Sequence, residues 1–213
     1  MRTAPEGRWF IAAAWAVALL LAALAFRHPF LWWVLLVWLP IAIWVVAFFR
    51  DPIRQWSIGD AQLIAPADGR VVSVVEVDEP AFFGGRATRV SIFMNVFDCH
   101  VNRYPCDGVV AYRHYNPGRF GHAGTEKASL DNEQSSVGLD TARGKVLVRQ
   151  IAGLVARRIV TDHAVGHQAK QGERMGMIRF GSRVDLFVPV GTEVLVRVDE
   201  KTQVGRTVVA RWR

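Results

Sequence analysis

The sequence predicts a mainly β protein, an antiparallel β sandwich or barrel that follows an N-terminal hydrophobic helical hairpin. Three observations lead to this prediction. Nearly all formal charges lie after residue 49, short β-branched runs divided by Gly, Pro and Asp begin near residue 61, and no extended helical periodicity is convincing after residue 54. We therefore expect two units, a membrane hairpin over residues 1–49 and a β domain over residues 50–213.

The hairpin is predicted from two uncharged apolar stretches, residues 9–26 and 30–49. At 1.5 Å per residue they would extend about 27 and 30 Å, close to the thickness of one hydrocarbon core. Only Arg27, His28 and Pro29 separate them, so the helices must be antiparallel neighbours if both span. Four arginines, at positions 2, 8, 50 and 54, flank the outer ends against one in the turn, so the positive-inside rule places the domain on the cytoplasmic face of the cell's inner membrane.

Two other interpretations of this segment stay open. A cleavable signal peptide is one, because Ala23-Leu24-Ala25 closes the first stretch in the small-x-small manner that a signal peptidase reads. The other is a shallow hairpin that enters one leaflet, turns at residues 27–29 and is kinked at Pro40.

The β domain is predicted from β-branched runs that alternate with turn residues. The expected strands are residues 70–77, 89–93, 108–112, 145–151, 184–190, 193–198 and 206–212, with turns at 189–191 and around Val204-Gly205. Residues 116–137 form the longest segment without a strong strand pattern, which is typical of a functional loop. The turn spacing of residues 66–72 and of Gly166, Gly172 and Gly176 resembles lipoyl-like domains, but no lysine attachment site is present, which argues against a swinging-arm carrier.

Composition limits the class of protein. The chain has 213 residues, 51% hydrophobic and 21% charged, which excludes a disordered chain and a large multidomain machine. Cys99 and Cys106 match neither a zinc framework nor a disulfide scaffold, so we expect two reduced thiols. The net charge of +7 is carried mainly by scattered arginines without a nucleic-acid-binding signature. We therefore expect membrane lipid, and no nucleic acid, as the anionic partner.

Candidate chemistry is confined to four clusters, since common phosphate-loop, dinucleotide, metalloprotease and serine-hydrolase motifs are missing from the sequence. Each cluster alone has a structural explanation: a turn, a buried histidine, a loop brace and a strand start. The clusters are Pro66-Ala67-Asp68-Gly69, the segment 97–105, Leu130-Asp131-Asn132-Glu133-Gln134, and Arg179-Phe180-Gly181-Ser182-Arg183-Val184-Asp185.

Together, and in this order after a hydrophobic N-terminus, the clusters resemble phosphatidylserine decarboxylase proenzymes, most closely the small, archaeal-type form. The resemblance covers residues 65–189, and its most specific element is Gly181-Ser182. The segments Ala65-Pro66-Ala67-Asp68-Gly69, His100-Val101-Asn102-Arg103-x-Pro105 and Asn132-Glu133 support it.

The resemblance implies a lyase that cuts itself between Gly181 and Ser182 into a large subunit, 1–181, and a small one, 182–213. In that family the serine hydroxyl attacks the carbonyl of the preceding glycine, an ester replaces the amide, and elimination leaves a pyruvoyl group. Ser182 would thus supply a covalent pyruvoyl cofactor, with no metal and no pyridoxal phosphate. A Schiff base between that group and phosphatidylserine would yield phosphatidylethanolamine and CO2.

Residue roles follow from the same resemblance. Ser182 is the predicted nucleophile, His100 the base and Asp68 its orienting carboxylate. Arg183, Arg103, Asn132 and Glu133 are the predicted substrate-binding residues. Arg103 stands where the longer members of the family have a second histidine, and arginine cannot act as a base at neutral pH. Either His100 serves both steps, or the chain recruits His114, His122, His163 or His167.

Two other functions remain open from the sequence: a non-enzymatic membrane-anchored adaptor, and the same chemistry on a related lipid such as a phosphatidylthreonine analogue. The adaptor needs only the anchor and the strands, whereas the enzyme requires self-cleavage. The expected partners of the enzyme are phosphatidylserine, the membrane and the two subunits of one precursor, and a homo-oligomer is compatible with the sequence.

Overall fold

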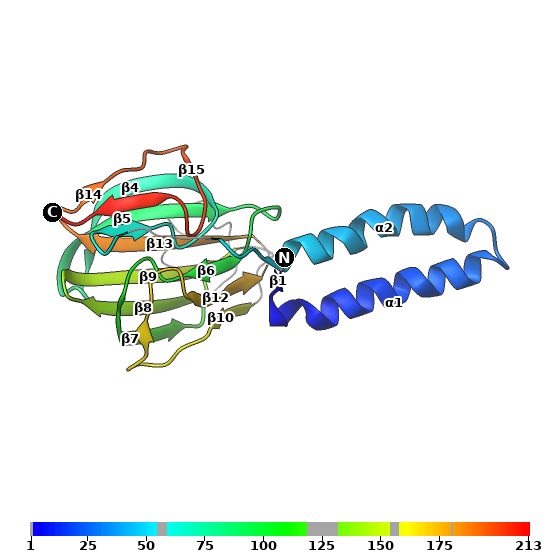
Figure 1. Ribbon diagram of the computed structural model, residues 1–213, viewed down its shortest axis with the longest axis horizontal. Coiled ribbons are helices and arrows are strands. Elements are labelled where there is room, and N and C mark those ends of the chain that lie inside the picture. The colour runs from blue at the N-terminus through cyan, green and yellow to red at the C-terminus, as the bar shows by residue number, and fades with distance from the viewer. Residues whose placement is uncertain (1, 55–58, 119–131, 154–157, 180) are drawn as a thin grey trace. The chain divides into compact units, whose positions relative to one another are not determined.

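The computed structural model describes residues 2–54, 59–118, 132–153, 158–179 and 181–213. The chain divides into two compact units, Met1–Ile53 and Arg54–Arg213. The first holds the helices and the second holds most of the strands (Figure 1).

The first unit is an antiparallel helical hairpin. Its elements are β1 (Arg2–Thr3), the 3-10 helix η1 (Pro5–Gly7), α1 (Arg8–Ala25), α2 (Leu31–Phe48) and β2 (Arg50–Asp51). The indole Nε1 of Trp38 on α2 donates a hydrogen bond to the Ala14 carbonyl of α1 at 2.9 Å. β1 pairs antiparallel with β2, so both ends of the hairpin lie together.

The hairpin's outer surface is apolar. Trp9 is 85% exposed, Trp33 73% and Leu19 70%. Such large apolar side chains in contact with water would be costly, and a lipid environment removes that cost. By length and composition both helices are able to cross a membrane, in agreement with a membrane-associated chain.

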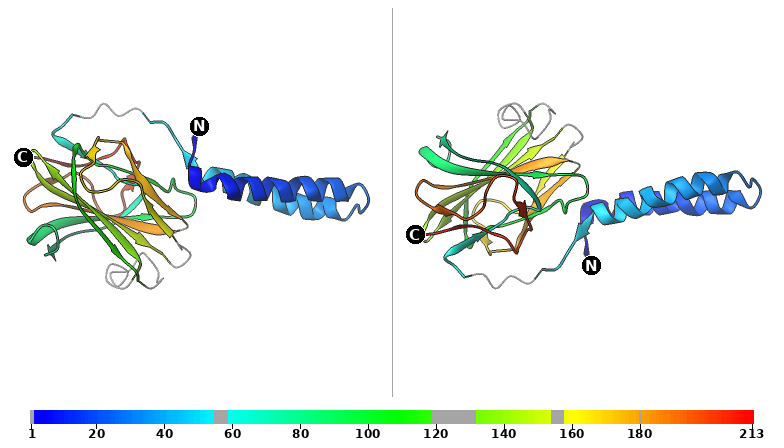
Figure 2. Two further views of the ribbon diagram at one scale, coloured as in Figure 1. Left: turned by 90° about the horizontal axis from the view of Figure 1, so that it is seen from below. Right: turned by 90° about the horizontal axis from the view of Figure 1, so that it is seen from above.

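The second unit is built from antiparallel strands that curl around a common interior (Figure 2). The strands are β3 (Gln62–Ile64), β4 (Gly69–Glu79), β5 (Gly85–Met94), β6 (Val101–Arg103), β7 (Gly108–Asn116), β8 (Gln134–Thr141), β9 (Gly144–Ala152), β10 (Arg158–Thr161), β11 (Gln168–Ala169), β12 (Arg174–Arg179), β13 (Ser182–Pro189), β14 (Glu193–Val194), β15 (Lys201–Thr202) and β16 (Val208–Arg211). The largest sheet has the order β11-β7-β8-β9-β13-β5-β4-β15. Two three-stranded sheets, β10-β12-β6 and β14-β16-β3, complete the domain.

The core lies between these sheets and is made mainly of β-branched and other aliphatic side chains. Its buried members include Val71, Ile92, Val148, Ile178 and Leu186. β13 is central in the large sheet, and all its residues but the last are buried. Such burial on both faces of a strand requires neighbours on each side and a second layer above it, which the two smaller sheets help to provide.

The predicted fold class is confirmed: the protein is mainly β and carries an N-terminal helical hairpin. The strands expected at 70–77, 89–93, 108–112 and 145–151 lie inside β4, β5, β7 and β9. The interpretation of 116–137 as a loop was wrong at its end, because β8 begins at Gln134 and pairs with both β7 and β9. The sequence pattern did not indicate this strand, because its Ser and Gly residues are not typical of strands. Pairing with β7 and β9 stabilises it.

Candidate active site

β13 places Ser182 at one end of the large sheet, between two neighbouring strands. Ser182 is the first residue of the strand and is paired with Met94 on β5 and with Ala152 on β9. Its side chain is fully buried, at 0% exposure. A hydroxyl in this position is shielded from bulk water, so a reactive ester formed there would be protected from hydrolysis.

Gly181 occupies a backbone conformation that suits glycine. Its φ is +56°, in the left-handed region where a side chain is strained. A Cβ placed on Gly181 would meet no described atom within 4 Å. Backbone strain rather than crowding therefore favours glycine on the amino side of Ser182. Phe180, the residue before it, lies outside the described residues.

The Ser182 hydroxyl is held only weakly. Its Oγ donates to the Met94 thioether sulfur at 3.5 Å, and the Asn102 amide Nδ2 donates to the same sulfur at 3.7 Å. A thioether is a poor acceptor, so little energy opposes rotation of the hydroxyl toward a base. Asn102 is fixed in turn, since its Oδ1 accepts a hydrogen bond from Gln150 Nε2 at 2.9 Å.

His100 is buried beside the segment that leads to Ser182. Its carbonyl oxygen accepts the Ile178 backbone N–H at 3.3 Å, and its side chain is 0% exposed. The ring Nδ1 lies 3.0 Å from the Asp98 carbonyl oxygen, which can only accept. That contact requires the proton on Nδ1, and it leaves Nε2 as the basic nitrogen.

Asp68 is held by a cation and a backbone amide. Arg54 donates through Nη1 to Oδ1 at 2.5 Å and through Nη2 to Oδ2 at 2.7 Å, and the Val204 N–H donates to Oδ1 at 2.7 Å. The Pro66 carbonyl accepts the Arg103 N–H at 3.0 Å, so this turn contacts the His100 segment. The orienting role predicted for Asp68 toward His100 stays a prediction.

Asn132 and Glu133 lie one strand away from Ser182. The Asn132 Nδ2 donates to the Ala152 carbonyl at 2.7 Å, and the Ala152 N–H donates to the Glu133 carbonyl at 2.9 Å. Ala152 is itself the strand partner of Ser182. The Tyr115 hydroxyl donates to Glu133 Oε1 at 2.8 Å, and this bond, together with burial and the Glu133 charge, raises the pKa of Tyr115.

Arg183 and Arg103, both predicted to bind substrate, are buried and make contacts inside the domain. Arg183 donates to both carboxylate oxygens of Asp185, at 2.6 and 3.0 Å, and to the Ser91 hydroxyl at 2.9 Å. Arg103 donates to the Gly172 carbonyl at 3.0 Å. These contacts favour a positioning role for each, while their substrate-binding roles remain predictions.

The structure therefore joins the four predicted clusters at one end of the large sheet. Backbone hydrogen bonds and strand register connect the turn of Asp68, the His100 segment, Asn132-Glu133 and the start of β13. Sequence reasoning missed Arg54, Met94 and Gln150 as contributors. Asn102 stands in the motif that begins at His100, but the sequence predicts no role for it. Leu130, Asp131 and His122 lie outside the described residues.

The described histidines that the sequence offers in place of the second base, His114, His163 and His167, lie elsewhere. His114 is exposed on β7, where it stacks on Tyr112. His163 and His167 lie in the connection between β10 and β11, beside Glu173 and at the opposite end of β12 from Arg179. His100 is thus the histidine that the described contacts tie most directly to the start of β13.

Comparison with known proteins identifies the family of the chain. The profile of the phosphatidylserine decarboxylase family matches residues 41–210. A phosphatidylserine decarboxylase proenzyme of Symbiobacterium thermophilum is 47% identical, covering 92% of this chain and 93% of that protein. Proenzymes of the same name from Pelagibacter ubique and Nitrosomonas europaea are each 46% identical, covering 97% and 98% of this chain and 94% of each protein. These similarities favour the enzyme over the adaptor.

Proposed function

The chain belongs to the phosphatidylserine decarboxylase family, and we propose that its maturation and its chemistry centre on the peptide bond between Gly181 and Ser182. It is a lyase proenzyme that decarboxylates phosphatidylserine, and its cofactor is a pyruvoyl group made from its own chain. Cleavage of the precursor therefore yields two subunits, and the cut proposed here makes them residues 1–181 and 182–213.

The proposed cleavage begins at the Ser182 hydroxyl. Its oxygen attacks the Gly181 carbonyl carbon, His100 Nε2 accepts the hydroxyl proton, and the amide C–N bond breaks as an ester forms. The freed nitrogen of residue 182 takes up the proton from His100. β-Elimination then breaks the ester C–O bond on the residue 182 side, so the Gly181 carboxylate leaves and the chains separate. Water adds to the resulting dehydroalanine and ammonia is lost, which gives the pyruvoyl group. The observation that carries this proposal is a loosely held, fully buried hydroxyl directly after a left-handed glycine.

Position 182 suits the group that maturation creates. The pyruvoyl carbonyl supplies an electron sink for decarboxylation. The Asn102 amide donates to Met94 and the Asn132 amide donates to Ala152, and these are the two strand partners of Ser182. Both amides would hold the new N-terminus of β13 in place. His100 would hold or deliver the proton at the substrate carbon, because its Nε2 is the basic nitrogen.

A pair of arginines supports the binding of an anionic head group. Arg158 on β10 and Arg179 on β12 are directly opposite each other in register, and Arg158 is exposed. Two guanidinium groups on facing strand positions bring two positive charges to one place, which suits an anionic ligand. Arg179 stands two residues before Gly181, so we propose that this pair contacts the phosphate or carboxylate of the lipid.

A tight turn just before His100 supports entry of the lipid substrate from the membrane. The Asn95 N–H donates to Asp98 Oδ2 at 2.8 Å and the Phe97 N–H donates to Asn95 Oδ1 at 2.8 Å. This turn presents Phe97 at 70% exposure, three residues before His100. We propose that Phe97 enters the bilayer interface and that the domain faces the cytoplasm, as the arginine distribution around the hairpin predicts.

The test is the intact mass of the full-length protein and its Ser182→Ala variant after expression and purification in detergent. We expect the wild type to give two fragments divided between residues 181 and 182, the smaller one blocked at its N-terminus. Ser182→Ala should remain one chain without decarboxylase activity.

Ser73→Ala is the matched control, because Ser73 Oγ lies on β4 and makes no hydrogen bond among the described residues. It should be cleaved like the wild type. A free serine N-terminus on the small fragment, or an active Ser182→Ala chain, would contradict the proposal.

A panel of lipid head groups would separate phosphatidylserine from a phosphatidylthreonine analogue.

A further inference from the structure

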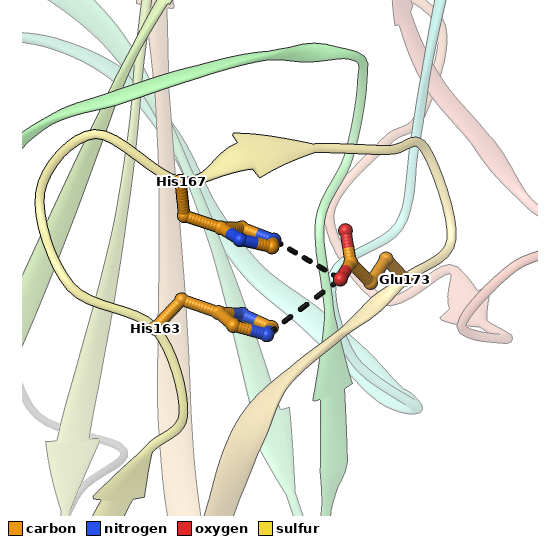
Figure 3. A group of neighbouring side chains, drawn as sticks. All are labelled: His163, His167 and Glu173. Carbon is orange, nitrogen blue, oxygen red and sulfur yellow. Dashed lines mark hydrogen bonds and ion pairs between the residues drawn. The ribbon is translucent and has the colours of Figure 1, made fainter.

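A second group of reactive side chains lies apart from Ser182. His163 and His167 come from the connection between β10 and β11, and Glu173 comes from the turn before β12 (Figure 3). Both imidazoles point their Nε2 atoms at the same carboxylate oxygen, Glu173 Oε1, at 3.6 Å for His163 and 3.0 Å for His167. We call these three residues the His-His-Glu cluster.

We propose that the His-His-Glu cluster binds one divalent transition-metal ion, with Zn2+ as the best match. One ligand atom from each residue lies within 4.8 Å of the others. Zinc bonds of about 2.0 to 2.1 Å in a tetrahedral arrangement place neighbouring ligand atoms about 3.3 Å apart. The two distances to Glu173 Oε1 lie on either side of that value.

The backbone around the His-His-Glu cluster is already fixed. Val110 on β7 exchanges hydrogen bonds with this loop, accepting from the Gly166 N–H at 2.8 Å and donating to the His167 carbonyl at 2.9 Å. The Tyr104 N–H donates to the Glu173 carbonyl at 2.9 Å. Arg113 donates to the His163 carbonyl. An ion would thus lose little free energy to ordering the chain.

In His163 and Glu173, the side-chain atoms that do not face the shared oxygen are also held. The Tyr104 hydroxyl lies 3.2 Å from His163 Nδ1, which leaves Nε2 of that ring as the ligand atom. The Lys170 N–H donates to Glu173 Oε2 at 2.9 Å, which leaves Oε1 toward the histidines. Outer contacts of this kind orient ligands in metal sites.

The imidazole rings must turn when the ion enters. They are stacked with centroids 3.7 Å apart and planes 3° from parallel, so their in-plane lone pairs do not yet converge. Rotation about the Cβ–Cγ bonds brings both Nε2 atoms toward one point while the backbone stays in place.

The type of ion follows from the donor set and its exposure. Two imidazole nitrogens and one carboxylate oxygen suit zinc and its neighbours better than Mg2+ or Ca2+, which prefer oxygen ligands. The side chains are 26%, 30% and 31% exposed for His163, His167 and Glu173. Solvent can therefore deliver the ion and supply a water as fourth ligand.

This site is separate from the decarboxylase centre. β12, a strand of six residues and about 20 Å, lies between the turn of Glu173 and the start of β13. The ion would join the β10–β11 connection to the turn before β12. The sequence predicts no metal for the pyruvoyl reaction, and the ion proposed here takes no part in it.

In the experiment, metals are first removed from the full-length protein in detergent. The protein is then titrated with ZnCl2, and the heat of binding is measured by isothermal calorimetry. We expect one ion per chain. At a hundredfold excess over the dissociation constant, zinc should raise the midpoint of thermal unfolding by about 5 to 10 °C. Co2+ should give a visible absorption spectrum of a low-coordinate nitrogen and oxygen site.

His167→Ala and Glu173→Gln should each weaken zinc binding by at least about tenfold to a hundredfold. His114→Ala is the matched control, since that histidine is exposed on β7 outside the cluster, and it should bind zinc like the wild type. Uncleaved Ser182→Ala should also bind normally, which separates this proposal from the cleavage proposal.

Three results would overturn the inference: no binding by the wild type, undiminished binding by folded His167→Ala and Glu173→Gln, or an equal loss in His114→Ala. Circular dichroism of each variant without metal shows whether it is folded. Should both cluster variants fail to fold, His167→Gln, which keeps the size and a hydrogen-bond donor, replaces them, and normal zinc binding by that variant would equally reject the site.

Discussion

The two ends of β12 carry polar clusters that differ in their contact with water. At one end Ser182, His100 and Asn102 are each 0% exposed and are enclosed by paired strands. At the other, His163, His167 and Glu173 have side chains 26 to 31% exposed and lie in connections between strands. Enclosure protects a reactive ester from hydrolysis, whereas partial exposure allows ligands to exchange with solvent. One strand thus separates a site suited to covalent chemistry from a site suited to reversible binding.

Among the variants that test this contrast, we expect the largest effect, on the rate of precursor cleavage, from a change at His100. His100→Gln removes the basic Nε2 while it keeps a polar side chain of similar size, so cleavage of the precursor should slow by about 10²- to 10⁴-fold. A denaturing gel over time after cell-free synthesis in the presence of detergent measures the rate.

His28→Gln, in the turn between the hairpin helices, is the control and should mature normally. Normal maturation of His100→Gln would transfer the role of base to another histidine. If His163 or His167 then proved essential, the two ends of β12 would not be functionally separate.

The second effect concerns the charges enclosed near Ser182. Arg183 and Asp185 have side chains 1% and 0% exposed, and they form a two-pronged ion pair. Asp185→Ala leaves a buried guanidinium without its carboxylate, which should lower the free energy of unfolding by about 3 to 5 kcal/mol. Chemical unfolding of the full chain in detergent measures the loss.

The double variant Arg183→Met with Asp185→Leu should be much more stable than Asp185→Ala, because no charge is then left buried. It also tests the substrate role predicted for Arg183. Full decarboxylase activity in the double variant would contradict that role, and equal instability of the two variants would contradict the ion-pair argument.

A smaller effect is expected at Arg54, which extends the enclosed cluster through Asp68. The pair is nearly buried, with side chains 12% and 11% exposed. Arg54→Ala leaves the Val204 N–H as the described donor to Asp68 and removes charge-assisted bonds worth about 1.5 to 3 kcal/mol. If Asp68 acts in cleavage, maturation should slow about tenfold to a hundredfold, as a gel time course would show.

Arg54→Lys keeps the charge but cannot make both parallel bonds, so it should lie between the wild type and Arg54→Ala. Asp68→Asn serves as the reference for complete loss of the carboxylate. A severe defect in Asp68→Asn with none in Arg54→Ala would show that Arg54 does not position the carboxylate.

The sequence predicted the parts of the fold that local composition determines. The β-branched runs around Val74, Val90 and Val148 became long strands, because such side chains fit the pleated, half-buried surface of a sheet. β8 and β12 were missed, since Ser135, Ser136 and Gly176 carry no strand pattern. Their conformation comes from pairing with neighbours, which one sequence does not reveal.

The residues of the candidate site also fall into a group that the sequence predicts and a group that it does not. Gly181, Ser182, His100 and Asp68 could be proposed because each stands in a short motif. The partner of Asp68 could not, since Arg54 is an ordinary arginine at the end of an arginine-flanked hairpin. The His-His-Glu cluster also escaped prediction: His163 and His167 are visible in the sequence, but their meeting with Glu173 depends on the turn before β12 and its contact with Tyr104.

The smallest expected effect concerns whether solvent reaches the buried side chains near the exposed end of β12. Cys106 lies two residues after Tyr104 and is only 4% exposed, and burial, followed by the Asp107 charge, raises its pKa to about 12. An unfolded thiol has a pKa of about 8.5. The native fold therefore favours the protonated thiol, and this contribution to stability is present below about pH 8.5 and is lost as the pH rises from there toward 12. A Cys99→Ser chain isolates the Cys106 thiol, which at pH 8 should react with a chromogenic disulfide reagent far more slowly when folded than in urea. Rapid reaction of the folded chain would mean that the reagent reaches the Cys106 side chain two residues after Tyr104, whose hydroxyl contacts His163, and the contrast between the two ends of β12 would then be one of degree.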